Sequence, residues 1–457
     1  MNLVAQQTIP QPEVRPRSRI GLAVAALFVV FPAVPFYIVL FRTALDIPFC
    51  DDYGGIEWVI HLEGLSGSAA KLSFLFESQV NEYKLVFAEA VVWLQVALMG
   101  HIDFKLLSAV SNAFVLLIAL LLWKMFLPAR KDLGLRLALF IPVTWLLFQF
   151  EYQELLNWGG VGLQHLPSLL FAFAAIYLLF GKTRRAFWGA LAFHVLAVAA
   201  STNGFLLLPI GLLVLVPGRR YARIALWLAT SAGCVVVYSY HYNVMSSKSS
   251  QDHSVISALL HMRPLYAISF IGSAAGPAFH VVSFVLGTLL CIFFFWMARR
   301  GYIRRSPAVS CCVLFLLLTA IGVAGIRSDM GLIQSVSSRY TIYSALFLIF
   351  AWFAIVEEFL QHSRVPLLDN GMYLGAVAAS VFFCILMDAT GYIQMKNWDE
   401  RVVEGMVEFE HPNPPGSTKG PVISLWKGDD DRERSNPSAR AALIESIKLG
   451  VYRPPKY

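Results

Sequence analysis

The most regular feature of the chain is a series of long apolar runs separated by short polar stretches. The first run, 20–41, holds no charged residue and is long enough, as a helix, to cross about 30 Å of hydrocarbon. It is too long for a signal-peptide core, and no A-x-A-like cleavage site follows it, so we expect it to be retained. The pattern predicts an all-α polytopic membrane protein with about eleven transmembrane helices. These are expected at 20–41, 104–127, 136–150, 164–180, 186–200, 204–217, 223–240, 279–298, 308–325, 340–360 and 371–388.

Basic residues gather in short clusters between these runs, as in Arg130-Lys131 and Arg304-Arg305. The positive-inside rule places such clusters in the cytoplasm. The apolar stretches 85–99 and 265–275 must then stay on the outer side without crossing the membrane. An extra crossing at either one would place the basic cluster that follows it outside the cytoplasm. The first cluster, Arg15, Arg17 and Arg19, puts the N-terminus in the cytoplasm, and the odd number of crossings then puts the C-terminus outside.

Three parts of the chain follow from this topology. Residues 1–19 form a cytoplasmic N-terminal segment, and residues 20–388 form the transmembrane domain, whose first outer loop is 42–103. Residues 389–457 form a polar extracytoplasmic tail, which is too small and too polar for a core of its own. We therefore expect the tail to pack on the outer face.

Composition supports a membrane protein and narrows its chemistry. The chain is 57% hydrophobic and 14% charged, against about 25% charged in soluble domains. Its net charge of +7 resides largely in the topology clusters, so nucleic acid is not expected as a partner. The six cysteines form neither a disulfide framework nor a metal-spaced cluster, and no nucleotide-binding glycine motif is present.

The first candidate site is acidic and follows the first predicted helix. Four carboxylates, of Asp46, Asp51, Asp52 and Glu57, lie within twelve positions, with Tyr53 beside the central pair. Adjacent carboxylates near a bilayer favour a raised pKa or a cation partner, and a carboxylate that takes a proton from a hydroxyl is a general base. The alternative is a solvated loop in which Asp forms turns.

Two further polar stretches fall on the predicted outer side. Asn81-Glu82-Tyr83-Lys84 opens the helix at 85–99, where Lys84 could meet a phosphate or snorkel to the interface. The second stretch lies between two predicted spans and contains Glu151, Asn157, Trp158 and His165. Its tryptophan could stack on a sugar ring or anchor the chain in the aromatic belt.

The last candidates are two arginines on the outer side, where arginine is disfavoured. Arg327 closes one predicted span, and Arg339, followed by Tyr340, opens the next. A guanidinium offers a planar fork that suits phosphate oxygens, such as those of a lipid headgroup. The alternative is an internal ion pair with a carboxylate of the first outer loop.

This layout resembles the GT-C superfamily of integral-membrane glycosyltransferases, such as the protein O-mannosyltransferases and aminoarabinose transferases. The likeness rests on the acidic pair Asp51-Asp52 after the first helix, on juxtamembrane helices at about 68–99, and on Arg339-Tyr340 opening a late helix. The Pro-Pro pair that often opens the second juxtamembrane helix is absent, and no large soluble tail domain follows. The chain is most similar to the bacterial members whose acceptors are unassigned.

The resemblance implies an inverting glycosyltransferase in the bacterial inner membrane. Its donor would be a polyprenyl-phosphate sugar and its acceptor a lipid- or glycan-linked hydroxyl of the cell envelope. Asp51 or Asp52 would be the general base, and Arg339, with Lys84 or Arg327, would bind the donor phosphate. The remaining polar residues would bind substrate: Tyr53, Glu57, Asn81, Glu82, Glu151, Asn157, Trp158, His165 and Tyr340. A divalent cation, Mg²⁺ or Mn²⁺, stays open as a cofactor.

Two other functions are compatible with the sequence. A polymerase or ligase of lipid-linked glycans also uses outward arginines, although its large late outer loop is only weakly represented at 241–278. A transporter or flippase for a lipid-linked sugar would place ionisable residues midway along several helices.

Overall fold

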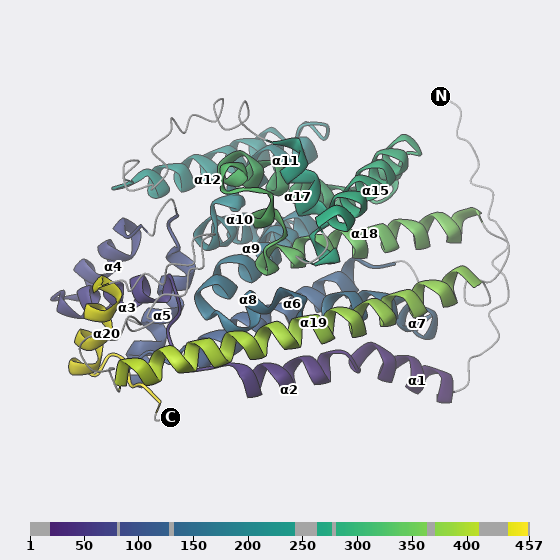
Figure 1. Cartoon of the computed structure of the whole chain (residues 1–457). Helices are drawn as coiled ribbons and strands as arrows, with labels where there is room; N and C mark the ends of the chain where they lie inside the picture. Colours follow the sequence, from purple (N-terminus) through teal and green to yellow (C-terminus); the bar gives the residue numbers. More distant parts are fainter. Residues whose placement is uncertain are drawn as a thin grey trace.

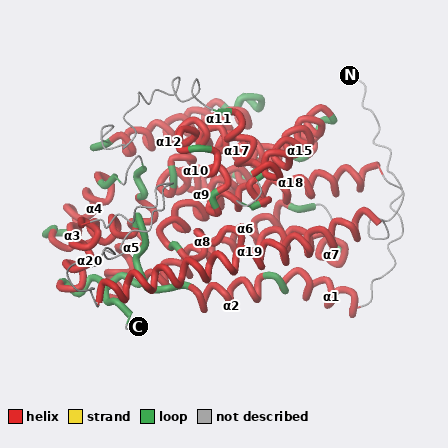
Figure 2. Tube along the Cα trace, viewed as in Figure 1, coloured by secondary structure: helices red, strands yellow, loops and turns green. Residues whose placement is uncertain are grey.

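The computed structural model describes residues 19–79, 83–127, 132–242, 263–276, 280–362, 371–410 and 437–455. In these ranges the regular elements are helices, and one isolated β-bridge joins Ile102 to Tyr452. The predicted all-α class is therefore confirmed. Figure 2 shows the helices linked by short loops.

Nine helical stretches in the described ranges are long and apolar enough to cross a membrane, which supports a polytopic membrane protein. The first is formed by α1 (Arg19–Val30) and α2 (Ala33–Thr43), and the third by α7 (Leu133–Leu147), η1 (Phe150–Tyr152) and α8 (Gln153–Asn157). The others are α6 (Phe104–Met125), α9 (Gly159–Leu179), α12 (Tyr221–Ser239), α15 (His280–Arg299), α17 (Pro307–Arg327, continuing through η6, Ser328–Met330), α18 (Ser338–His362) and α19 (Gly371–Glu410).

By length and composition, fewer helices in the described ranges qualify as transmembrane than the eleven predicted. The predicted spans 186–200 and 204–217 are helical but shorter than the nine, as α10 (Arg184–Ala200) and as η2 (Thr202–Leu206) with α11 (Leu207–Leu215). The helix of the last predicted span does not end at 388, because α19 continues without a break to Glu410. The first part of the expected tail is thus an extension of this helix.

Helix starts are set by side chains that accept hydrogen bonds from free backbone N–H groups. The Asp103 carboxylate accepts from Leu106 N (2.8 Å) at the start of α6, and the Asp132 carboxylate accepts from Leu135 N (3.0 Å) at the start of α7. An acceptor at this position satisfies a donor that has no partner within the helix. A helix end is set by glycine: after α5 (Val86–Met99), Gly100 adopts φ +76°, a left-handed conformation that favours glycine.

The long helices lie side by side, and α19 extends along most of the bundle (Figure 1). The start of α1, the end of α18 and the start of α19 lie at one end. At the opposite end lie α3 (Asp52–Gly64), α4 (Ser68–Glu77), α5 and α20 (Pro437–Lys448), which we call the α3 end. Helices are thus present in the range 68–99, where the sequence predicts juxtamembrane ones, and α20 packs against α3.

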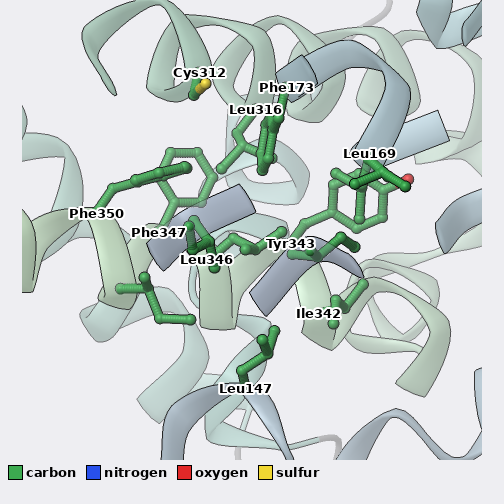
Figure 3. Close-up of a cluster of buried hydrophobic side chains, with 14 of the residues drawn as sticks. Leu147, Leu169, Phe173, Cys312, Leu316, Ile342, Tyr343, Leu346, Phe347 and Phe350 are labelled. Carbon is green, nitrogen blue, oxygen red and sulfur yellow. The ribbon is translucent and has the colours of Figure 1, made fainter. Parts of the chain in front are cut away.

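The centre of the bundle is filled by apolar side chains from α7, α9, α17 and α18. Phe173 packs edge-to-face against Phe315 and Phe350, with ring centroids 6.2 and 5.4 Å apart. Figure 3 shows Leu169, Leu316 and Phe347 in the same cluster. Between helices in a bilayer such packing acts mainly through van der Waals contact. The cluster fixes how the ends of α9, α17 and α18 meet at the site described next.

Candidate functional site

The acidic pair of the first loop divides into one buried and one exposed carboxylate. Asp52, at the start of α3, is 7% exposed, whereas Asp51 is exposed. The Asp52 carboxylate accepts hydrogen bonds from Phe49 N (3.1 Å) and from Trp158 Nε1 (3.2 Å), and its third donor is Gly160 N. Burial raises the pKa of Asp52 to about 7, which these three donors oppose only in part. Asp52 therefore joins the first loop to the start of α9.

Trp158 and Gly160 contact the Asp52 carboxylate directly. The Trp158 ring is 3% exposed and packs edge-to-face on Phe49, with centroids 5.2 Å apart. A side-chain carbon at Gly160 would lie 2.7 Å from Asp52 Oδ1, so this contact requires glycine. The Trp158 ring therefore packs against protein. A second tryptophan, Trp398 of α19, is only half-buried and packs edge-to-face on Phe49, with ring centroids 5.1 Å apart.

Cys50 connects the acidic pair with the late arginine. Burial raises the pKa of the Cys50 thiol to about 12; the negative charges of Asp51 and Asp52 add to the rise, and the positive charge of Arg339 opposes it. Arg339 is therefore close enough to this loop to act on it electrostatically. Glu57, one turn further along α3, is exposed, and Tyr53 is buried with the apolar residues beneath α3.

Arg339 lies in the first turn of α18 and is 8% exposed. Its Nε is 3.7 Å from Glu154 Oε2, and its backbone N donates to the same oxygen (3.4 Å). Ser337 Oγ also donates to Glu154 Oε2 (3.1 Å). The partner of Arg339 is thus a carboxylate of α8. The alternative considered from the sequence was an ion pair with a carboxylate of the first outer loop. Together the α18 N-terminus and the guanidinium form a cationic position that one carboxylate occupies.

A second arginine and several tyrosines surround this position. Arg327, at the end of α17, donates from its guanidinium to Tyr83 Oη (3.0 Å) and lies 5.7 Å from the centre of the Tyr83 ring. The charges of Arg327 and Arg339 act on Tyr266 of α14 (Pro264–Ile271), and Tyr340 lies in the same neighbourhood. Two guanidiniums and three phenols are therefore gathered where α14, α17 and α18 meet.

His165 contacts this cluster from α9. One of its ring nitrogens, Nδ1, lies 2.9 Å from Tyr343 Oη, and its ring is edge-to-face with Tyr340 at 6.0 Å. The Asn203 side chain is also hydrogen-bonded to Tyr343. The 3-10 helix η2, which contains Asn203, thus reaches the site as well.

Lys84 differs from the other predicted phosphate ligands. It is 1% exposed, and its Nζ donates to the carbonyl oxygens of Phe76 (2.6 Å) and Tyr240. Burial lowers the pKa of Lys84, and the nearby Glu89 carboxylate opposes this effect. Lys84 therefore joins the ends of α4 and α12 and holds the neighbouring Tyr83 beside Arg327.

Two other predicted substrate residues are used in contacts between helices. Asn157 Nδ2 donates to Asp399 Oδ1 (3.2 Å), and its Oδ1 accepts from Thr43 Oγ1 (3.4 Å). Glu151 is 1% exposed and accepts from Thr390 Oγ1 (3.1 Å). Asp399 and Thr390 both belong to the part of α19 beyond the predicted span. Asn81 and Glu82 lie outside the described residues.

The sequence analysis did not select Tyr266, Tyr343 or Asn203. All three lie at positions that a hydropathy pattern assigns to apolar packing or to a turn, so the pattern does not mark them as site residues. Within the described residues, no group of three or more His, Cys, Asp or Glu side chains could hold a metal ion.

Comparison with known proteins adds no relative. The chain matches no protein-family model, and no curated protein matches it significantly.

Proposed function

We propose that this membrane protein is an inverting glycosyltransferase of the GT-C type. It would transfer a sugar from a polyprenyl-phosphate donor to a hydroxyl of a cell-envelope acceptor on the outer face of the bacterial inner membrane. The observation that supports this most is that one short segment, 154–158, contacts both groups. Its Trp158 Nε1 donates to Asp52 (3.2 Å), and its Glu154 carboxylate pairs with Arg339 (3.7 Å). A cation for the leaving phosphate and a carboxylate for the attacking hydroxyl are the two groups that the reaction needs.

The bonds can be assigned to these groups. The acceptor oxygen attacks the anomeric carbon opposite the phosphate and forms the new glycosidic bond. The bond between the anomeric carbon and the phosphate oxygen breaks, and its electron pair goes to the phosphate. The proton of the acceptor hydroxyl goes to a carboxylate acting as general base. Arg339 and Arg327 stabilise the charge that grows on the phosphate, so no general acid is required.

Asp51 is the better candidate for the base. Its carboxylate is exposed, so an acceptor hydroxyl can reach it. Asp52 is buried and already accepts three N–H groups, so it is better suited to fix the loop that presents Asp51. The two adjacent acids then have different roles, one chemical and one positional.

The test is to replace Asp51 and Asp52 separately by asparagine and to compare envelope glycans by mass spectrometry. The matched control is Glu63→Gln, on the same helix, whose carboxylate pairs with Lys71 at the surface. Asp51→Asn should abolish one glycan modification at normal protein level, and the control should leave it intact. Unchanged glycans in both aspartate variants would contradict the proposal and favour a transporter.

A further inference from the structure

The strongest unexplained feature of the molecule is a buried hydroxyl group. Tyr266 is fully buried, and among the described residues its Oη has no hydrogen-bond partner. A buried polar group without a partner is unfavourable, because it has lost water and gained nothing in return. Such groups in native proteins call for an explanation, and a missing ligand is one.

The position of this hydroxyl narrows the explanation. The positive charges of Arg327 and Arg339 act on the Tyr266 phenol, as do the phenols of Tyr83 and Tyr340. Tyr266 packs with Ala324 of α17, one turn before Arg327. A guanidinium has N–H donors and no acceptor, so the O–H of Tyr266 still lacks an acceptor oxygen to which it can donate. The group that fits there is an anionic oxygen.

A second buried donor lies in the same neighbourhood. Arg339 Nε has no hydrogen-bond partner within the described residues, because Glu154 Oε2, at 3.7 Å, is within ion-pair distance but too far for a hydrogen bond. The two donors without partners come from α14 and α18, and the residues that carry them are more than 70 positions apart in sequence. Their meeting at one place is not explained by local structure.

The position of α14 is held on both sides. Ser344 Oγ of α18 donates to Ile271 O (2.6 Å), and Ser273 Oγ donates to Tyr340 O (3.3 Å). On the other side, side-chain carbons at Gly272 and Gly287 would collide with the backbones of α15 and α14, so these two helices touch only because both positions are glycine. The orientation of Tyr266 is thus set by packing before any ligand binds.

We infer that the Tyr266 hydroxyl is a binding group of this site, which donates a hydrogen bond to an anionic phosphate oxygen held between Arg327 and Arg339. This inference rests on the proposed function and adds a residue to it. Tyr266 contributes a neutral donor, which strengthens binding of a phosphate without adding charge. The cluster then offers donors from three helices, α14, α17 and α18, to one phosphate group.

The competing explanation is that Tyr266 only fills space. The two explanations predict different results for Tyr266→Phe, which removes the hydroxyl and keeps the ring. If the hydroxyl binds a ligand, then in the unliganded state Tyr266→Phe should be at least as stable as the original protein. The variant should also bind phosphate less well. If Tyr266 fills space, phosphate binding should not change.

The experiment measures the thermal midpoint of the full-length protein in detergent, with a polyprenyl monophosphate, inorganic phosphate or the parent polyprenol as probes. The matched control is Tyr373→Phe, because the Tyr373 hydroxyl is buried and donates to Ala138 O (3.1 Å) away from the site. We expect Tyr373→Phe to lower the midpoint and Tyr266→Phe to preserve or raise it. We expect Tyr266→Phe to weaken polyprenyl-phosphate binding about tenfold or more, because a hydrogen bond to a charged group is lost.

The outcomes separate the two proposals. Stabilisation by polyprenyl phosphate but not by polyprenol assigns the site to a lipid phosphate, and equal stabilisation by inorganic phosphate assigns it to the phosphate group alone. Equal affinity in Tyr266→Phe and the original protein would overturn the role of Tyr266 and leave the donor site in place. No stabilisation of the original protein by any phosphate probe would overturn both proposals.

Discussion

Arg339 and Glu154 form an ion pair at the start of α18, with 3.7 Å between Nε and Oε2, and Glu154 also accepts from the backbone N of Arg339. The glutamate therefore occupies the place where an anionic ligand would gain most from the arginine and from the helix N-terminus. A phosphate that binds there must compete with this carboxylate.

Replacing Glu154 by glutamine should therefore strengthen phosphate binding. Glutamine keeps an acceptor for Ser337 and removes the negative charge, which is worth about 0.3–1 kcal/mol at a helix N-terminus. We expect the Kd for polyprenyl phosphate to fall by up to about fivefold in a binding titration. The matched control is Glu358→Gln, which breaks the pairs with Arg300 and Arg305 at the opposite end of the bundle and should leave the Kd unchanged. Weaker binding in Glu154→Gln would mean that Glu154 supports the site.

The contact between Gly160 and Asp52 can be tested with an added methyl group. In Gly160→Ala the new carbon would meet Asp52 Oδ1 at 2.7 Å, so the carboxylate must move away from its three donors. We expect a loss of stability of about 1–3 kcal/mol in denaturant unfolding. The control Gly322→Ala in α17, where nothing lies within 4 Å, should be neutral or stabilising. Equal effects of the two changes would contradict the proposed contact.

Stability should fall as pH rises, in part because of a buried carboxyl group on α5. Glu89 is 7% exposed, and burial raises its pKa to about 7 from an ordinary value of 4.5. Between these two values the folded protein keeps a proton that the unfolded chain has lost, so the free energy of unfolding decreases with pH. Glu89→Gln should flatten this decrease between about pH 4.5 and 7, measured as the thermal midpoint across that range. An unchanged slope would show that other groups cause the dependence.

The C-terminal segment should hold the first loop in place. Tyr452 Oη donates to Asp46 O (2.6 Å), and Ile102 N donates to Val451 O (2.7 Å). In Tyr452→Phe we expect faster hydrogen exchange at residues 46–56, measured by mass spectrometry, because one tie to this loop is lost. Exchange in α18 serves as the internal reference and should not change. Identical exchange across residues 46–56 would contradict this role.

The sequence predicts the helices better than it predicts their contacts. The run 20–41 and the return helix at 104–127 are recovered because each is a continuous apolar stretch with polar residues on both sides. The end of α19 is missed because residues 389–410 are polar, yet they continue the helix where Thr390 and Asp399 meet Glu151 and Asn157.

Site residues depend on burial, which a linear pattern does not report. Lys84 and Trp158 both carry polar groups suited to a ligand, and both point into the protein because of contacts with distant segments, at Tyr240 and at Asp52. Tyr266 lies in an apolar stretch, and only the packing of α14 between α15 and α18 brings it to the arginines. Asp51 was selected as one of an adjacent acidic pair after the first helix, and Arg339 because arginine is disfavoured on the predicted outer side.

The most direct test of the account is mass spectrometry of the lipid that co-purifies with the protein. If Asp51 is the base and Arg339 holds the donor phosphate, Asp51→Asn should retain an unreacted polyprenyl-phosphate sugar. The double variant Asp51→Asn/Arg339→Ala should lose it. A lipid-linked sugar on the first protein and not on the second is the predicted result. Absence of any phosphate-linked sugar from Asp51→Asn, or equal amounts on both proteins, would contradict the account.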